Sequence, residues 1–241
     1  MNPELASHII AIAVSFGVSL PILRQGIRSG DLPAVLLGAA VGFDGIEWLF
    51  WTLCVFTPAY ETPLGDAFAV VCRIGISAAV ICLIFFTRVV FRPRDRAAGV
   101  ALWLLIAAMV VGLFGSGTVG DWGGWRNDHA WNWIELFAQI AGYGWAAWES
   151  LAYHLKLRRR AVRGLADPLL ANRLLLWSLY AGMYCTTQIG YGTVLAFYET
   201  LTQLDMLLVA FTITGQISLW LAFFPPPLFA RWVRAAYAAE S

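Results

Sequence analysis

The sequence predicts an all-α membrane protein, a bundle of seven transmembrane helices. Of its 241 residues, 60% are hydrophobic and only 13% are charged, whereas soluble domains carry about 25% charged residues. Seven apolar segments reach the length of about 20 residues that a helix needs to cross a bilayer. Because the connections between them are short, we expect residues 1–241 to form a single membrane domain.

The segments follow one another with little between them. We expect them at about 5–23, 32–56, 67–91, 100–120, 134–156, 174–197 and 204–229. The second follows Asp31-Leu-Pro, which is typical of a helix start. It also carries Gly38 and Gly42, a spacing that lets a neighbouring helix approach closely. The last contains Pro225, Pro226 and Pro227, which we expect to stop the helix near the membrane surface.

Basic residues are concentrated on one side of this arrangement. Fourteen of the sixteen lysines and arginines follow segments 1, 3, 5 and 7. On the opposite side we find one basic residue, Arg126, among several acids. The positive-inside rule then predicts an N-terminus outside and a cytoplasmic C-terminus. We expect the protein in the bacterial cytoplasmic (inner) membrane, with the lipid bilayer as its first partner.

Two carboxyl groups lie in the middle of segment 2. Asp44, Glu47, Trp48 and Trp51 share one face of the predicted helix, and a charge in hydrocarbon costs several kcal/mol unless it is paired or protonated. Arg73 in segment 3 has a similar depth, so we expect it to pair with Asp44, Glu47 or both. The surplus carboxyl would then be protonated or bind a cation or donor. A cluster of this kind can equally hold helices in register without further function.

Polar residues also recur at helical spacing in segments 5, 6 and 7. Lipid penalises polar side chains, so we expect these stripes to face one another and to line an outward-facing pocket with aromatic walls. Such a pocket suits a small amphipathic ligand. The candidate ligand-binding or proton-handling residues are Asp44, Glu47, Trp48, Arg73, Gln139, Thr187, Gln188, Tyr191, Thr212 and Gln216.

The loop at 121–133 contains four tryptophans. Tryptophan is enriched where membrane meets water, which favours an interfacial aromatic belt. A lid over the pocket is the alternative.

Several chemistries find no support in the sequence. Retinal needs a lysine in the middle of helix 7, and the only lysine, Lys156, ends segment 5. His8 and His129 are predicted on the opposite side from His154, so they cannot share a zinc site with it. Ser116 has no histidine within an apolar run to activate it. Glu149 is expected to meet His154 or Arg158. We therefore predict no catalytic residue, no metal site and no nucleic-acid partner, and the sequence indicates no particular cofactor.

Two functions remain. The first is a non-enzymatic, receptor-like ligand-binding or sensory module that signals through a membrane or cytoplasmic protein partner, with an accessory subunit of a membrane complex as a close variant. The second is a small proton-coupled transporter that uses Asp44, Glu47 and Arg73. Internal repeats, which are common in transporters, are not visible.

Overall fold

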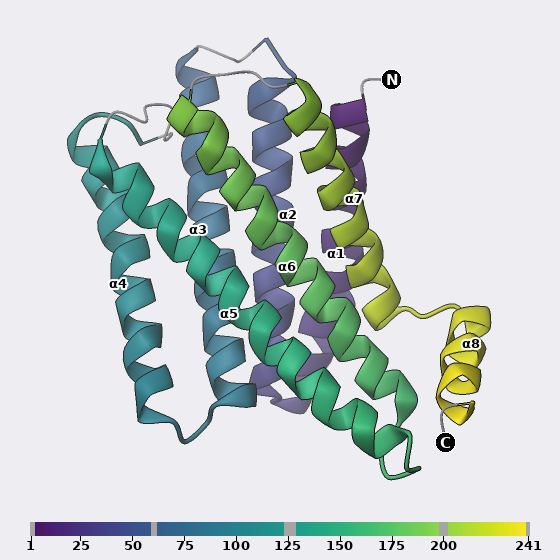
Figure 1. Ribbon diagram of the computed structural model, residues 1–241. Coiled ribbons are helices and arrows are strands. Elements are labelled where there is room, and N and C mark those ends of the chain that lie inside the picture. The colour runs from purple at the N-terminus through teal and green to yellow at the C-terminus, as the bar shows by residue number, and fades with distance from the viewer. Residues whose placement is uncertain (1–2, 59–61, 123–128, 198–201, 240–241) are drawn as a thin grey trace.

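The computed structural model describes residues 3–58, 62–122, 129–197 and 202–239, without the side chains of 194–205. In these ranges the chain forms eight helices and no strand. Figure 1 shows seven long helices side by side and a short eighth helix at one end. The helices are α1 (Pro3–Ser29), α2 (Leu32–Val55), α3 (Pro63–Phe91), α4 (Arg96–Thr118), α5 (Ala130–Ala161), α6 (Pro168–Phe197), α7 (Thr202–Phe223) and α8 (Pro227–Ala238).

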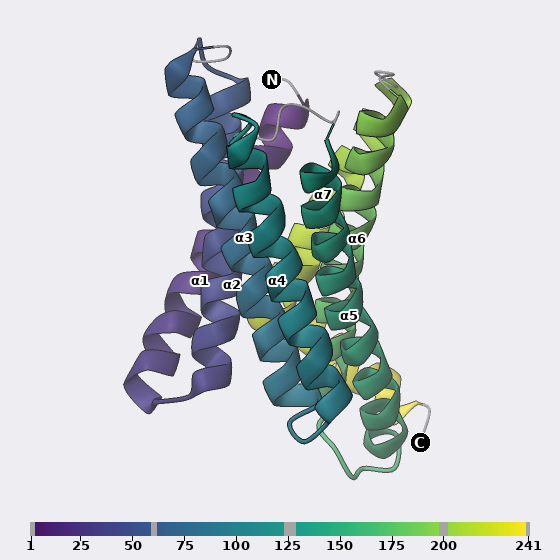
Figure 2. The same ribbon diagram turned by 90° about the vertical axis from the view of Figure 1, so that its left-hand side faces the viewer.

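The bundle has two ends of different composition. The start of α1 and the last residues of α2, α4 and α6 lie at the upper end in Figure 1, which we call the N-terminal end. The connections after α1, α3 and α5 lie at the opposite end with most of the arginines, which we call the arginine-rich end. Figure 2 shows the same two ends from the side.

Five helices are long and apolar enough to cross a membrane, by length and composition: α1, α2, α3, α4 and the Met206–Phe223 part of α7. This supports an integral membrane protein. The helices α5 and α6 do not meet this criterion, so the count of seven spans and the orientation remain predictions. Both run alongside the other five through the bundle (Figure 1).

Helix ends follow the local sequence. Asp95 caps α4 by accepting hydrogen bonds from the amides of Ala97 and Ala98 at 2.9 and 3.2 Å. The predicted start of α2 is confirmed, with Asp31 at the N-cap and proline in the first turn. The last predicted segment is interrupted, because α7 ends at Phe223 and a separate helix begins at Pro227. Proline lacks an amide hydrogen and disrupts a helix interior, but it is well tolerated in a first turn.

Close helix packing brings α1 against α2. A Cβ atom on Gly38 would lie 2.9 Å from the backbone nitrogen of Leu23, so only glycine permits this distance. Ser19 also donates a hydrogen bond to the carbonyl of Gly38 at 2.8 Å. The small-residue spacing in α2 therefore serves helix packing, as predicted.

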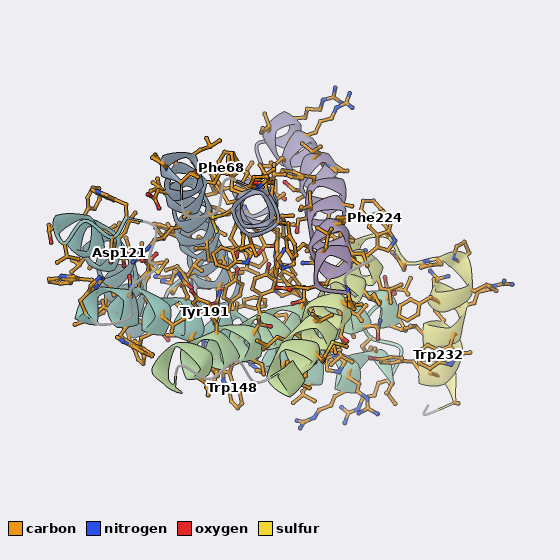
Figure 3. The ribbon with its side chains drawn as sticks, turned by 90° about the horizontal axis from the view of Figure 1, so that it is seen from above. Phe68, Asp121, Trp148, Tyr191, Phe224 and Trp232 are labelled. Carbon is orange, nitrogen blue, oxygen red and sulfur yellow. The ribbon has the colours of Figure 1, made fainter. Side chains whose placement is uncertain are left out.

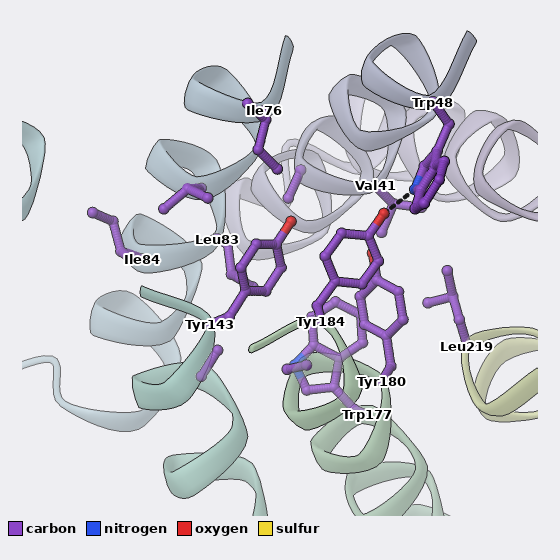
Figure 4. Close-up of a cluster of buried hydrophobic side chains, with 14 of the residues drawn as sticks. Val41, Trp48, Ile76, Leu83, Ile84, Tyr143, Trp177, Tyr180, Tyr184 and Leu219 are labelled. Atoms are coloured by element: carbon purple, nitrogen blue, oxygen red, sulfur yellow. Dashed lines mark hydrogen bonds between the residues drawn. The ribbon is translucent and has the colours of Figure 1, made fainter. Parts of the chain in front are cut away.

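The core lies between α2, α3, α5, α6 and α7. Leu83 and Ile84 of α3 face Tyr143 of α5 in Figure 4. A group of aromatic rings from α6 continues this core toward α2 and α7: Trp177, Tyr180 and Tyr184. The aromatic core directly borders the polar site described next.

Candidate functional site

A cavity of about 200 Å³ lies between α2, α3, α5 and α6. It is smaller than the roughly 300–1,000 Å³ of drug-sized ligand sites, so it suits a small ligand. Figure 3 shows Tyr191, one of its lining residues, inside the ring of helices, whereas Trp148 and Trp232 lie on the outside. The lining residues are Glu47, Trp48, Trp51, Ala69, Cys72, Arg73, Ile76, Asn132, Glu135, Leu136, Gln139, Tyr184, Thr187, Gln188 and Tyr191.

The structure brings most of the candidate residues together. The members that line the cavity are Glu47, Trp48, Arg73, Gln139, Thr187, Gln188 and Tyr191. Three others, Asp44, Thr212 and Gln216, are buried but are not among its lining residues. The expected meeting of polar faces thus holds for α2, α3, α5 and α6, while the polar residues of α7 lie elsewhere.

Arg73 forms a different ion pair from the one expected. Its Nε donates to Glu135 Oε2 at 2.6 Å, and Ser77 donates to the other oxygen of Glu135 at 2.7 Å. Both members of the ion pair are buried, with side-chain exposures of 9% and 3%. The predicted pairing of Arg73 with Asp44 or Glu47 is therefore wrong. Glu135 neutralises the guanidinium of Arg73 because α5 packs against α3 and brings the two side chains to the same depth.

The remaining Arg73 donors tie α3 to neighbouring segments. Nη2 donates to Ser116 at 2.8 Å and to Asn132 at 2.7 Å, and Nη1 donates to the backbone carbonyl of Asp121 at 3.2 Å. We call Arg73, Ser77, Ser116, Asn132 and Glu135 the Arg73 network. A buried guanidinium requires hydrogen-bond acceptors for its N–H groups, and the Arg73 network supplies them.

The network reaches the tryptophan-rich connection between α4 and α5. Asn132 donates to Asp121 Oδ2 at 3.2 Å, and His129 lies 3.2 Å from the same oxygen. Residues 123–128 lie outside the described residues, so the choice between an aromatic belt and a lid remains a prediction. The described part shows that both ends of this connection are held at the Arg73 network.

Asp44 has its own polar surroundings. Its Oδ2 accepts hydrogen bonds from Ser15 of α1 at 3.0 Å and from Tyr180 of α6 at 3.2 Å. Tyr143 and Tyr184 stack on each other with ring centroids 4.8 Å apart. Both interact electrostatically with the carboxyl group of Asp44. Figure 4 shows Tyr143, Tyr184 and Tyr180 side by side, with Trp48 hydrogen-bonded to Tyr184. Asp44 thus links α1, α2 and α6.

Glu47 lies one turn from Asp44. Each of the two carboxyl groups leaves one buried oxygen without a hydrogen-bond partner among the described residues, Asp44 Oδ1 and Glu47 Oε2, but only Glu47 lines the cavity. A buried polar atom without a partner costs about 1–3 kcal/mol, and more when charged. This orphaned oxygen at the cavity wall is the feature of the site that most needs a ligand.

Gln216 of α7 is another buried side chain whose polar atoms have no partner among the described residues. It is fully buried, and neither its amide oxygen nor its amide nitrogen has a hydrogen bond among the described residues. Since it is not part of the cavity wall, its assignment to the ligand site stays a prediction, as does that of Thr212.

Glu149 pairs with Arg92 at the arginine-rich end, with Nε 2.8 Å from Oε1. The expectation that His154 or Arg158 would answer it is wrong for His154, which instead contacts the carbonyl of Ala171 at 2.8 Å. The carboxylate of Glu149 raises the pKa of the Arg92 guanidinium above its ordinary value.

Sequence reasoning missed four residues of the Arg73 network: Ser77, Ser116, Asn132 and Glu135. A signal was present, because Glu135 begins the polar stripe of segment 5. Arg73 also follows the start of α3 by about three turns, on the same side of the membrane as the start of α5. A comparison of the depths of the charged residues in segments 3 and 5, in addition to segments 2 and 3, indicates the pairing of Arg73 with Glu135.

No group of three or more His, Cys, Asp or Glu side chains is placed to hold a metal ion in the described ranges. Comparison with known proteins finds no matching protein family, curated protein or solved structure. The functional reading therefore depends on the geometry of the site.

Proposed function

We propose that this chain is a non-enzymatic, ligand-binding module of the bacterial inner membrane, with the cavity between α2, α3, α5 and α6 as its binding site. The observation that carries the proposal is the convergence of four helices on one small cavity, with a carboxyl oxygen in its wall that has no partner in the described part of the chain. A protein that uses these residues only for packing gains nothing from leaving a carboxyl oxygen unsatisfied.

In this proposal all seven long helices cross the bilayer. The helices α5 and α6 bury polar residues such as Glu135, Gln139 and Ser178, and they expose apolar side chains such as Phe137, Trp148 and Ile189. The arginine-rich end then lies in the cytoplasm by the positive-inside rule, and the cavity lies toward the outer surface.

Signalling would pass to a membrane or cytoplasmic protein partner at the arginine-rich end. Helix α8 lies there and exposes Leu228 and Trp232. The same surface serves an accessory subunit, in which the partner is a larger membrane complex.

A proton-coupled transporter is the second candidate. It is favoured by the neighbouring carboxyl groups of Asp44 and Glu47, which interact electrostatically. The separate pairing of Arg73 with Glu135 removes the arginine from the predicted cluster. A liposome flux assay with a proton-gradient dye distinguishes the two candidates, since a binding module moves no protons.

Native mass spectrometry of protein purified in mild detergent tests the binding proposal. We expect a stoichiometric small-molecule adduct on the native chain that is lost when Ala69, a buried wall residue, is changed to Phe to fill the cavity. Ala107→Phe on the exposed face of α4 is the matched control and should retain the adduct. Equal occupancy in both variants, or a native chain that stays empty after incubation with membrane extract, would contradict the proposal.

A further inference from the structure

The cavity has one carboxyl group in surplus. Three charged side chains line it: Glu47, Arg73 and Glu135. The guanidinium of Arg73 donates hydrogen bonds to Glu135, Ser116 and Asn132, and both oxygens of Glu135 accept hydrogen bonds. Of these three, Glu47 alone keeps a buried oxygen with no partner in the described part of the chain. An anionic ligand would find no unoccupied guanidinium there and would meet this carboxyl group.

The other walls are aromatic and apolar. Trp48, Trp51, Tyr184 and Tyr191 line the cavity with Ile76 and Leu136. Tryptophan and tyrosine rings attract cations through their electron-rich faces, with a contribution that rises to about 2 kcal/mol or more when the cation is desolvated. Aromatic side chains beside a carboxylate are the combination that recognises substituted ammonium groups.

The alternatives fit less well. A bare metal ion needs several oxygen, nitrogen or sulfur ligands, and no suitable group of three occurs within the described ranges. A neutral apolar ligand would leave the Glu47 oxygen buried and unsatisfied. An organic cation places its positive charge beside this oxygen and its apolar substituents against the rings.

We infer that the cavity binds a small organic cation whose ammonium group faces Glu47 and whose apolar substituents lie among Trp48, Trp51 and Tyr184. This inference rests on the proposed function and names the ligand class of the same site. Because the cavity measures about 200 Å³, the ligand has to be smaller than a typical drug.

Phenyltrimethylammonium and its neutral isostere tert-butylbenzene have the same shape and differ in charge, so they test the inference directly. Isothermal titration calorimetry on the full chain in detergent, corrected with protein-free micelles, measures both affinities. We expect the cation to bind at least about tenfold more tightly to the native protein. Glu47→Gln should remove this preference, and Glu47→Asp should keep part of it. Glu149→Gln, the same change at the arginine-rich end, should leave it intact.

Cys72 provides a readout located at the site, because its thiol group belongs to a residue that lines the cavity. In a chain with Cys54, Cys82 and Cys185 changed to Ala, the cation should slow alkylation of Cys72, as measured by peptide mass spectrometry. It should fail to do so once Glu47 is Gln. Thermal unfolding of each variant establishes that the fold is retained.

The outcomes separate the two proposals. Equal affinity for the cation and the isostere, or unchanged cation affinity in Glu47→Gln, would overturn the cation inference while leaving a ligand cavity in place. Binding of both probes without protection of Cys72 would place them outside the cavity and overturn the inference as well. Failure of both probes to bind, in a protein that still carries a native adduct, would overturn the cation inference alone.

Discussion

Two arginine–glutamate pairs connect α3 to α5, one near each end of the bundle, and their surroundings differ sharply. Arg73 and Glu135 are buried, with side-chain exposures of 9% and 3%, and belong to a network of hydrogen bonds. Arg92 follows the last residue of α3, and its side chain is 46% exposed beside Glu149. Because the cost of an unpaired charge depends on burial, two arginine–glutamate pairs can contribute very differently to the free energy of unfolding.

The largest expected effect comes from removing one partner of the buried pair. Glu135→Ala leaves the guanidinium of Arg73 without its counter-charge in a buried site, so we expect a loss of about 3–5 kcal/mol in the free energy of unfolding. Unfolding by SDS titration in mixed micelles measures it. The matched control is Glu149→Ala, which leaves Arg92 exposed to solvent and should cost much less. Equal losses for both variants would show that burial does not distinguish the pairs.

The double substitution Arg73→Met and Glu135→Met sharpens this test. Replacing both charges with apolar groups avoids an unpaired buried charge, so the double variant should be more stable than Glu135→Ala. If it is equally unstable, the loss arises from packing and hydrogen bonds within the network.

The second prediction concerns the distance between α4 and α5. A Cβ atom on Gly112 would lie 2.9 Å from the carbonyl oxygen of Trp131 and 3.0 Å from the nitrogen of Glu135. Gly112→Ala should therefore separate the helices and cost about 1–3 kcal/mol. Gly99→Ala on the same helix meets only the Arg88 side chain at 3.8 Å and should not destabilise the protein. The same unfolding assay compares the two, and an unaffected Gly112→Ala would contradict the close packing.

The third prediction removes a single donor and acceptor of the buried network. Ser116 accepts a hydrogen bond from Arg73 and donates one to Asn132 at 2.9 Å. Ser116→Ala should cost about 1 kcal/mol, since other acceptors of Arg73 remain. Thr118→Ala, which removes a hydroxyl bound only to the nearby Gly115 carbonyl and exposed at the helix end, is the control. Unfolding midpoints that do not differ would mean that Ser116 is dispensable.

The smallest effect is expected at Arg92, the exposed member of its pair with the buried Glu149. Arg92→Gln keeps a polar side chain at an exposed position, so its unfolding midpoint should shift less than that of Ser116→Ala. Any shift should shrink further as salt is added, because solvent ions screen exposed charges. A salt-independent loss as large as that of Glu135→Ala would instead make Arg92 part of the buried core.

Local patterns in the sequence were sufficient for much of the fold. Runs of apolar residues marked all seven long helices, and Asp31 with Pro33 marked the start of α2. The break at Pro225 was expected, but the helix that follows it was not, because twelve residues with mixed polarity give no spanning signal. Burial of polar stripes likewise predicted part of the cavity lining, including Gln139 and Gln188.

The sequence by itself determined that this chain is helical, apolar enough for a membrane and polar along particular helix faces, because these properties depend on residues three to four positions apart. Only the tertiary structure decided that Arg73 pairs with Glu135, that Asp44 is enclosed by hydroxyl groups and that Glu47 faces the cavity. The physical reason is that a buried charge takes the partner that neighbouring helices bring to its depth. That neighbourhood is set by packing across the bundle, which joins residues about 60 positions apart in the chain.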